Sequence, residues 1–165
     1  MSNRPTGQQP LVPSVLDRLI DDEPDVRAEA PRSSAQLFRE LKQSVRRDLE
    51  DLLNTRWACL TWPESLAELD DSLVNYGIPD FTASDLDATR DPDILLRAIE
   101  QCINRFEPRL KNVRLHPLET AESANRTFRF RIDGVLCVEP FEDAVRYDSS
   151  LETATGTVHI EGAER

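Results

Sequence analysis

The sequence predicts an α+β fold in which N-terminal helices pack on a C-terminal antiparallel sheet of three to four strands. Upstream of Phe106, apolar residues recur every three to four positions, as they do on one side of an amphipathic helix. Beyond Pro108 the apolar residues alternate with polar ones, as they do along a half-buried strand. Helices followed by neighbouring strands are typical of α+β domains.

Composition excludes several classes of function. The chain has 165 residues, of which 39% are hydrophobic, and this is enough for one domain with a core. The net charge of −11 disfavours binding to nucleic acid or to an anionic membrane surface, because both recruit Lys and Arg. No apolar run approaches the roughly 20 residues that span a bilayer, and the polar start lacks a signal-peptide core.

Cysteine usage points to a reducing compartment. Cys59, Cys102 and Cys137 are odd in number, far apart and without CxxC spacing, which is typical of free thiols. Together with the composition, this pattern leads us to expect a cytoplasmic protein that neither inserts into a membrane nor binds nucleic acid.

Residues 1–32 are predicted to form a flexible N-terminal segment that contains one short docking helix. Ser14 is placed to cap a helix within the apolar island 11–20. Two helical turns are not stable alone in water, so the island either folds back on the core of its own chain or docks in a groove of a partner protein. We favour docking, because the acidic, proline-containing link 21–31 allows the island to move. The residues predicted to dock are Val15, Leu16 and Leu19.

Residues 33–165 are expected to form a single domain that opens with a long helix. Ser33 and Gln36 have the spacing of a capping box. An apolar stripe follows to about Leu53 and contains Phe38, Leu41, Val45, Leu49 and Leu52. The charged residues on this helix, Asp48 among them, are of both signs, and we interpret them as a solvated surface.

An acidic stretch, residues 64–93, separates the first long helix from the second. It lacks the ligand spacing of a calcium loop, so we interpret it as a solvated surface rather than a metal site. Within it, Gly77 is expected to end a short helix. Asp91 and Pro92 are residues typical of the N-cap and first position of a second helix, which is predicted to run to Phe106.

Strands are expected after Pro108. Val113–Leu118 and Thr127–Glu139 should pair as a hairpin, with Gly134 at a bulge or bend. Shorter candidates are Val145–Asp148 and Thr157–Ile160, with a turn at Leu151–Gly156 between them. The last strand should lie near a sheet edge, where a strand of another chain can pair.

The candidate functional site is the corner Glu107-Pro108-Arg109 between helix and sheet. Pro108 disfavours helical geometry at Glu107 and cannot continue the helical hydrogen bonds. One acidic and one basic side chain are therefore held on a stiff turn. Such a pair is either a structural clamp or a reactive site.

Motifs for other chemistry are missing from the sequence. His116 and His159 show no metal-ligand spacing, and the chain has neither a GxSxG elbow nor a glycine-rich phosphate loop. A glycosidase needs two carboxylates that flank a sugar, one of them with a raised pKa. A neighbouring Arg109 would instead favour the charged form of Glu107, which suits a clamp better than a general acid. We therefore expect no cofactor, no metal and no enzymatic activity.

Four motifs occur in a characteristic order, and they are LLNTR (52–56), YGIPDF (76–81), FEPRL (106–110), and EP followed by YDSSL (139–140 and 147–151). With the leading SVLDRL (14–19), they resemble the TssE family of type VI secretion baseplate subunits. That family is similar to the small wedge protein of contractile-phage baseplates, once labelled a lysozyme.

The resemblance implies a structural component of a contractile injection machine, in which TssE-like proteins sit with the wedge subunits TssF, TssG and TssK. They offer a sheath-like fold on which the first ring of the contractile sheath is laid. Glu107, Pro108 and Arg109 match the signature corner of the family, and the C-terminal strands are where its members would exchange strands with a sheath subunit. The alternative is a peptidoglycan-cleaving muramidase that uses Glu107, which the old label of the family suggests.

Overall fold

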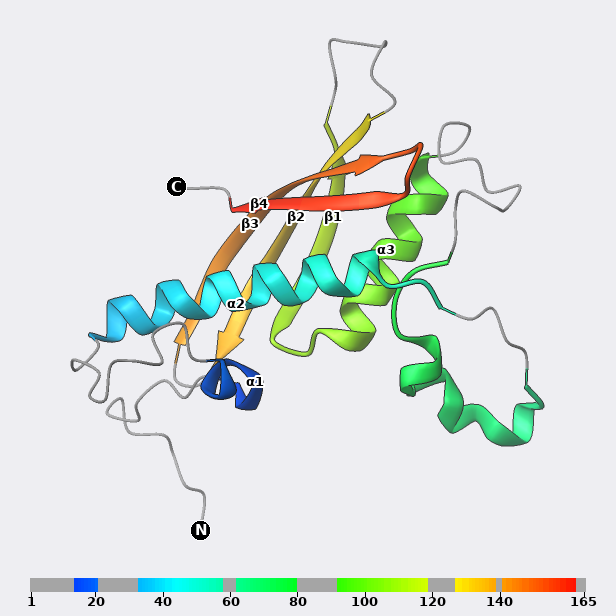
Figure 1. Cartoon of the computed structure of the whole chain (residues 1–165), viewed down its shortest axis with the longest axis horizontal. Helices are drawn as coiled ribbons and strands as arrows, with labels where there is room; N and C mark the ends of the chain where they lie inside the picture. The colour runs from blue at the N-terminus through cyan, green and yellow to red at the C-terminus, as the bar shows by residue number, and fades with distance from the viewer. Residues whose placement is uncertain are drawn as a thin grey trace.

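Figure 1 shows the computed structural model, which describes residues 14–20, 33–57, 62–79, 92–118, 127–138 and 141–162. Its elements in chain order are α1 (Val15–Leu19), α2 (Ser34–Asn54), the 3₁₀ helices η1 (Glu64–Asp71) and η2 (Leu73–Asn75), α3 (Pro92–Phe106), β1 (Leu110–Pro117), β2 (Thr127–Val138), β3 (Phe141–Glu152) and β4 (Thr157–Gly162). The strands form one antiparallel sheet in the order β1-β2-β3-β4, so the predicted α+β fold is confirmed. The predicted link 21–31, Asp91 and Cys59 lie outside the described residues.

The two long helices begin and end close to the predicted positions. Ser33 and Gln36 form the expected capping box: the Ser33 N–H donates to Gln36 Oε1 at 2.8 Å, and the Gln36 N–H donates to Ser33 Oγ at 3.3 Å. Helix α2 ends at Asn54, after which the backbone becomes extended. Helix α3 begins at Pro92 and ends at Phe106, as the sequence predicts.

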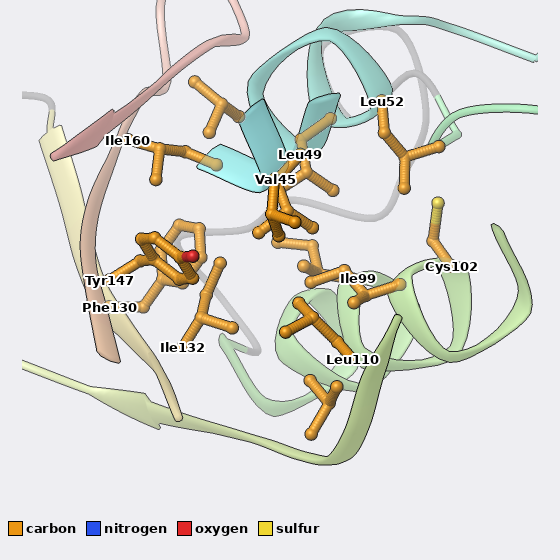
Figure 2. Close-up of a cluster of buried hydrophobic side chains, with 14 of the residues drawn as sticks. Val45, Leu49, Leu52, Ile99, Cys102, Leu110, Phe130, Ile132, Tyr147 and Ile160 are labelled. Atoms are coloured by element: carbon orange, nitrogen blue, oxygen red, sulfur yellow. The ribbon is translucent and has the colours of Figure 1, made fainter. Parts of the chain in front are cut away.

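The core lies between the two helices and one face of the sheet, and Figure 2 shows their side chains meeting there. Buried residues occupy alternate positions of the two central strands, which puts them on a single face. They are Phe130, Ile132 and Leu136 in β2 and Val145, Tyr147 and Leu151 in β3. The α2 stripe enters this core through Leu41, Val45, Leu49 and Leu52, while Phe38 packs half-buried at its border.

The strand β3 is much longer than the predicted Val145–Asp148. It pairs with β2 over its whole length, from Val138 opposite Phe141 to Thr127 opposite Glu152. Because β3 carries polar residues at both ends, its sequence pattern alone does not indicate strand there, and hydrogen bonding to β2 decides the length. The turn before β4 is shortened accordingly, since Leu151 and Glu152 still belong to β3.

A bulge occurs where Gly134 predicts one, but its extra residue lies in β1. Lys111 pairs with Val135 and Arg114 pairs with Asp133, so Asn112 and Val113 together face Gly134. Asn112 has a φ of 53°, in the left-handed region that asparagine tolerates better than most residues. The bulge bends the strand that leads away from the Glu107 corner.

Gly77 lies two residues beyond the end of η2, at a close contact with the end of α2. Its φ is 105°, and a Cβ at this position would lie 2.3 Å from the Thr55 carbonyl oxygen. Only glycine fits such a contact. The close approach allows a parallel β-bridge between Arg56 and Ile78, which joins the segment before α3 to the end of α2.

The strand β4 lies at the predicted edge, but α2 side chains occupy part of that edge. The Asn54 amide donates to the Val158 carbonyl at 2.8 Å and accepts from the Val158 N–H at 2.9 Å. Arg46 donates to the Ile160 carbonyl at 2.7 Å. Arg56, two residues beyond α2, donates to the Gly156 carbonyl in the turn before β4. These backbone groups are therefore satisfied without a neighbouring strand.

In the part of the chain that the structure describes, no helix combines the length and apolar character that crossing a membrane requires.

Candidate functional site

The Glu107-Pro108-Arg109 corner is a hydrogen-bonded turn between α3 and β1. The Glu107 N–H donates to the Ile103 carbonyl at 2.9 Å, so the helical hydrogen bonds continue to Glu107. The Leu110 N–H donates to the Glu107 carbonyl at 3.2 Å and closes a four-residue turn with Pro108 in its second position. Proline favours that position because its φ already has the required value.

Glu107 and Arg109 form a bidentate ion pair across this turn. Arg109 Nε donates to Glu107 Oε1 at 2.7 Å, Arg109 Nη2 donates to Oε2 at 2.5 Å, and the Arg109 N–H donates to Oε1 at 3.2 Å. Glu107 is 5% exposed, whereas the Arg109 side chain is 23% exposed. The hydrogen bonds to Glu107 raise the pKa of the Arg109 guanidinium above its ordinary value, against the opposing effect of burial. The guanidinium therefore stays charged, and its two parallel hydrogen bonds to the carboxylate hold the turn as a fixed clamp.

Asp48 on α2 is a third member of this site, and sequence reasoning missed it. Its Oδ2 accepts from Arg109 Nη2 at 2.6 Å, so Arg109 ties the corner to the helix that covers the sheet. The interpretation of Asp48 as part of a solvated surface is therefore wrong, since its side chain is only 23% exposed. Because 61 residues separate Asp48 from Arg109, no local spacing in the sequence indicates the contact.

The ion pairs continue from Asp48 to the N-terminal helix α1. Arg47 Nη2 donates to Asp48 Oδ1 at 3.0 Å and to Asp17 Oδ1 at 2.7 Å. Charges of alternating sign thus connect the corner with α1, in the order Glu107, Arg109, Asp48, Arg47 and Asp17. The Ser14–Asp17 spacing is that of a capping box and indicates the local contact, but not the contact with α2.

The residues predicted to dock lie on the outside of α1. Val15 is 74% exposed, Leu16 is 54% exposed and Leu19 is 75% exposed, and none of them belongs to the core cluster. The neighbouring Ile20 is 43% exposed. Helix α1 thus contacts the domain through Asp17 and leaves its apolar residues available.

The remaining candidates for chemistry lie apart from this site. His116 and His159 are largely exposed in β1 and β4, with Asp133 and Glu50 as their neighbours. The described ranges contain no group of three or more His, Cys, Asp or Glu residues that could hold a metal ion. Burial raises the pKa of Cys102 to about 12, and its thiol donates to the Gly77 carbonyl, which is the behaviour of a core residue rather than a nucleophile.

Comparison of the chain with known proteins identifies a protein family that it matches. The family model for baseplate wedge protein gp25 matches residues 39–140. No curated protein matches the chain significantly. Among solved structures, a chain of the baseplate complex from the type VI secretion system has 17% sequence identity and a TM-score of 0.44, with 67% of this chain and 93% of that chain covered.

The matched family segment runs from α2 to the end of β2, which is most of the chain, and it contains the three residues of the clamp: Asp48, Glu107 and Arg109. The predicted kinship with contractile-phage wedge proteins is thereby confirmed. This chain belongs to the baseplate wedge protein gp25 family.

Proposed function

We propose that this chain is a TssE-type structural subunit of a type VI secretion baseplate, which links the wedge subunits to the first sheath ring and supports sheath assembly. Membership of the gp25 family supports the baseplate role. The ordered motifs that resemble TssE support the type VI setting. The observation that carries the proposal is the clamp in which a buried Glu107 holds Arg109, and Arg109 holds Asp48.

The clamp suits a scaffold because it fixes the relative position of two surfaces before a partner arrives. It joins the turn between α3 and β1 to α2, and α2 in turn covers the edge of β4. A preorganised surface loses little conformational entropy when it binds. The partly exposed Arg109 guanidinium is then presented to an adjoining baseplate or sheath subunit in an orientation that Glu107 sets.

The same geometry disfavours the muramidase alternative. A general acid must release a proton to a sugar oxygen, and its partner carboxylate must face it across the substrate. Both carboxylate oxygens of Glu107 instead accept hydrogen bonds from Arg109. The nearest carboxylate of the clamp, Asp48, binds the same guanidinium rather than facing Glu107 across a cleft. We therefore infer a non-enzymatic role without a cofactor.

We further propose that Val15, Leu16 and Leu19 dock on a wedge subunit, with TssF, TssG and TssK as the candidates. The occupant that fits α1 is an apolar groove with basic side chains at its border, because the acids Asp21, Asp22 and Glu23 follow the apolar residues in sequence. A second copy of this chain is a poor occupant, since two molecules of charge −11 repel each other.

Substitution of the clamp tests the assembly role. Either Glu107→Ala or Arg109→Ala strands a charge, which costs about 3–5 kcal/mol in a fully buried pair and less here, because Arg109 is partly exposed. The double variant Glu107→Gln/Arg109→Gln strands no charge within the pair and is expected to stay folded. We expect all three to lose sheath assembly and secretion in cells, and to lose co-purification with the wedge subunits.

Arg114→Ala is the matched control, because it removes a β1 arginine that forms an exposed ion pair with Glu100 on α3. It should leave assembly and thermal unfolding nearly unchanged. If the double glutamine variant assembles sheaths normally, the Glu107-Pro108-Arg109 corner is not required for the proposed function. If the purified protein clears peptidoglycan and Glu107→Gln abolishes this activity, the muramidase alternative would be favoured over the structural role.

A further inference from the structure

Helix α1 is oriented opposite to an ordinary amphipathic helix. Such a helix turns its apolar side toward the core and its polar side toward water. In α1 the polar Asp17 contacts α2, while Val15, Leu16 and Leu19 point away from the domain and remain exposed. The helix has five residues, none of them buried, so apolar packing does not hold it in place. Another interaction must position it.

Asp17 supplies that interaction. Its Oδ1 accepts from Ser44 Oγ at 2.8 Å and from Arg47 Nη2 at 2.7 Å. Its Oδ2 accepts from the Ser14 hydroxyl at 2.6 Å and from the Ser14 N–H at 3.2 Å. One carboxylate therefore both completes the capping box that starts α1 and attaches α1 to α2. Folding of the helix and its attachment to the domain depend on the same group.

The side of α2 that faces Asp17 carries two hydrogen-bond donors for its carboxylate, Ser44 and Arg47. Ser44 and Arg47 are three residues apart, which places both on one side of the helix. Ser44 is buried although polar, and Asp17 is the acceptor of its hydroxyl. Burial alone would raise the pKa of Asp17, but hydrogen bonds from Ser14, Arg47 and Ser44 lower it to about 2. The carboxylate is thus charged at neutral pH.

We propose that Asp17 is the positioning residue of the docking helix: it anchors α1 to Ser44 and Arg47, so that the apolar side of α1 faces an apolar, basic-bordered groove of a partner protein. The proposal rests on the proposed docking of Val15, Leu16 and Leu19 and adds how that surface is oriented. It also joins the docking helix to the clamp, because Arg47 binds Asp17 and Asp48 at once.

Asp17 lies outside the segment that matches the gp25 family, which begins at residue 39, whereas its partners Ser44 and Arg47 lie inside that segment. Removal of Asp17 should leave the clamp intact, because Asp48 keeps both Arg47 and Arg109 as partners. The two parts of the surface are therefore separable by substitution.

The first measurement is hydrogen exchange of the full-length protein without a partner. In Asp17→Asn, the amides of Arg18 and Ile20, which donate to Ser14 and Leu16 within α1, should exchange about tenfold faster, equivalent to about 1.4 kcal/mol. Amides of α2 should not change. Asp17→Glu should restore slow exchange, since glutamate is the usual residue at the third helical position of a capping box. Equal exchange in Asp17→Asn and the wild type would overturn the anchor.

The second measurement is affinity for the co-expressed wedge subunits named above. We expect Asp17→Asn to weaken binding about tenfold, Asp17→Glu to retain it, and Glu68→Gln, which removes a charge from exposed η1, to have no effect. Leu16→Ala/Leu19→Ala tests the docking itself. If the leucine variant loses binding and Asp17→Asn keeps it, the anchor fails and the docking proposal stands. If the leucine variant binds normally, docking through α1 is wrong, and the positioning role fails with it.

Discussion

At the scale of single residues, the decisive contacts are those of carboxylates with arginines from distant parts of the chain. Glu107 forms its ion pair with Arg109, only two residues away, and because Pro108 between them favours a turn, this contact can be predicted from the sequence. Asp48 and Asp17 find their partners 61 and 30 residues away. The Ser14–Asp17 spacing indicates a local capping contact, but nothing in the sequence around either aspartate indicates its contact with a distant arginine.

Asp17 allows a pH prediction. An aspartate whose folded pKa lies below its ordinary value of 3.8 adds stability that is complete above that value and is lost as the pH falls through the folded pKa of about 2. At pH 3.8 we therefore expect Asp17 to be almost fully charged, whereas an unperturbed aspartate is half protonated. The carboxyl carbon shift in an NMR titration measures this directly. Arg47→Gln should move the midpoint upward, and a wild-type midpoint near 3.8 would contradict the anchoring contacts.

Ser149 supports a stability prediction. Its side chain is buried in β3, and its hydroxyl has no hydrogen-bond partner among the residues that the structure describes. An unpaired buried hydroxyl destabilises a fold, so Ser149→Ala should raise the free energy of unfolding by about 1 kcal/mol. Ser150→Ala, on the opposite face of the same strand, is the control and should change it little. Urea unfolding compares the two, and a less stable Ser149→Ala would show that the hydroxyl has a partner in solution.

At the scale of elements, the relation between α2 and β4 alters the expectation for the sheet edge. The sequence predicted that the last strand lies near an edge, and this is confirmed. An edge strand presents unpaired backbone groups to other chains. Here Asn54 takes the place of a neighbouring strand opposite Val158, with one hydrogen bond in each direction. A strand of another chain could pair along this part of β4 only after displacing Asn54.

Substitution of Asn54 tests this covering of the edge. Asn54→Ala removes two hydrogen bonds to β4 and should lower the free energy of unfolding by about 1–3 kcal/mol. It should also increase self-association through the opened edge, as sedimentation would show. Asn104→Ala is a close control, because Asn104 makes the same bond to the carbonyl four residues before it in α3, without a bond to a strand. Equal effects of both variants would mean that Asn54 serves α2 alone.

At the scale of the whole molecule, the segment that matches the gp25 family and the elements that the clamp joins are largely the same part of the chain. The gp25 match covers most of α2 and all of α3, β1 and β2, so it contains both the α3–β1 turn and the helix that the clamp joins. Helix α1 lies beyond the match and joins the scaffold through Asp17. Under the function proposed above, the elements that the clamp joins form the central part of the subunit, and α1 forms a separately anchored contact surface. We therefore expect substitutions in one part to leave the other part intact.

Local patterns in the sequence determined the elements, because they depend on neighbours along the chain. The capping residue Ser33, the helix start at Pro92 and the corner at Pro108 act through backbone geometry within a few residues, and each was placed correctly. The two-residue period placed the β1–β2 hairpin for the same reason.

Only the tertiary structure decided how those elements are joined. The length of β3, the bulge in β1 opposite Gly134 and the contact of Asn54 with β4 all depend on the partner strand or helix. The contacts of Asp48 with Arg109 and of Asp17 with Arg47 likewise form between residues brought together by packing of the core. A charged residue on a helix has the same sequence surroundings whether it faces water or a distant arginine, so only the fold distinguishes the two.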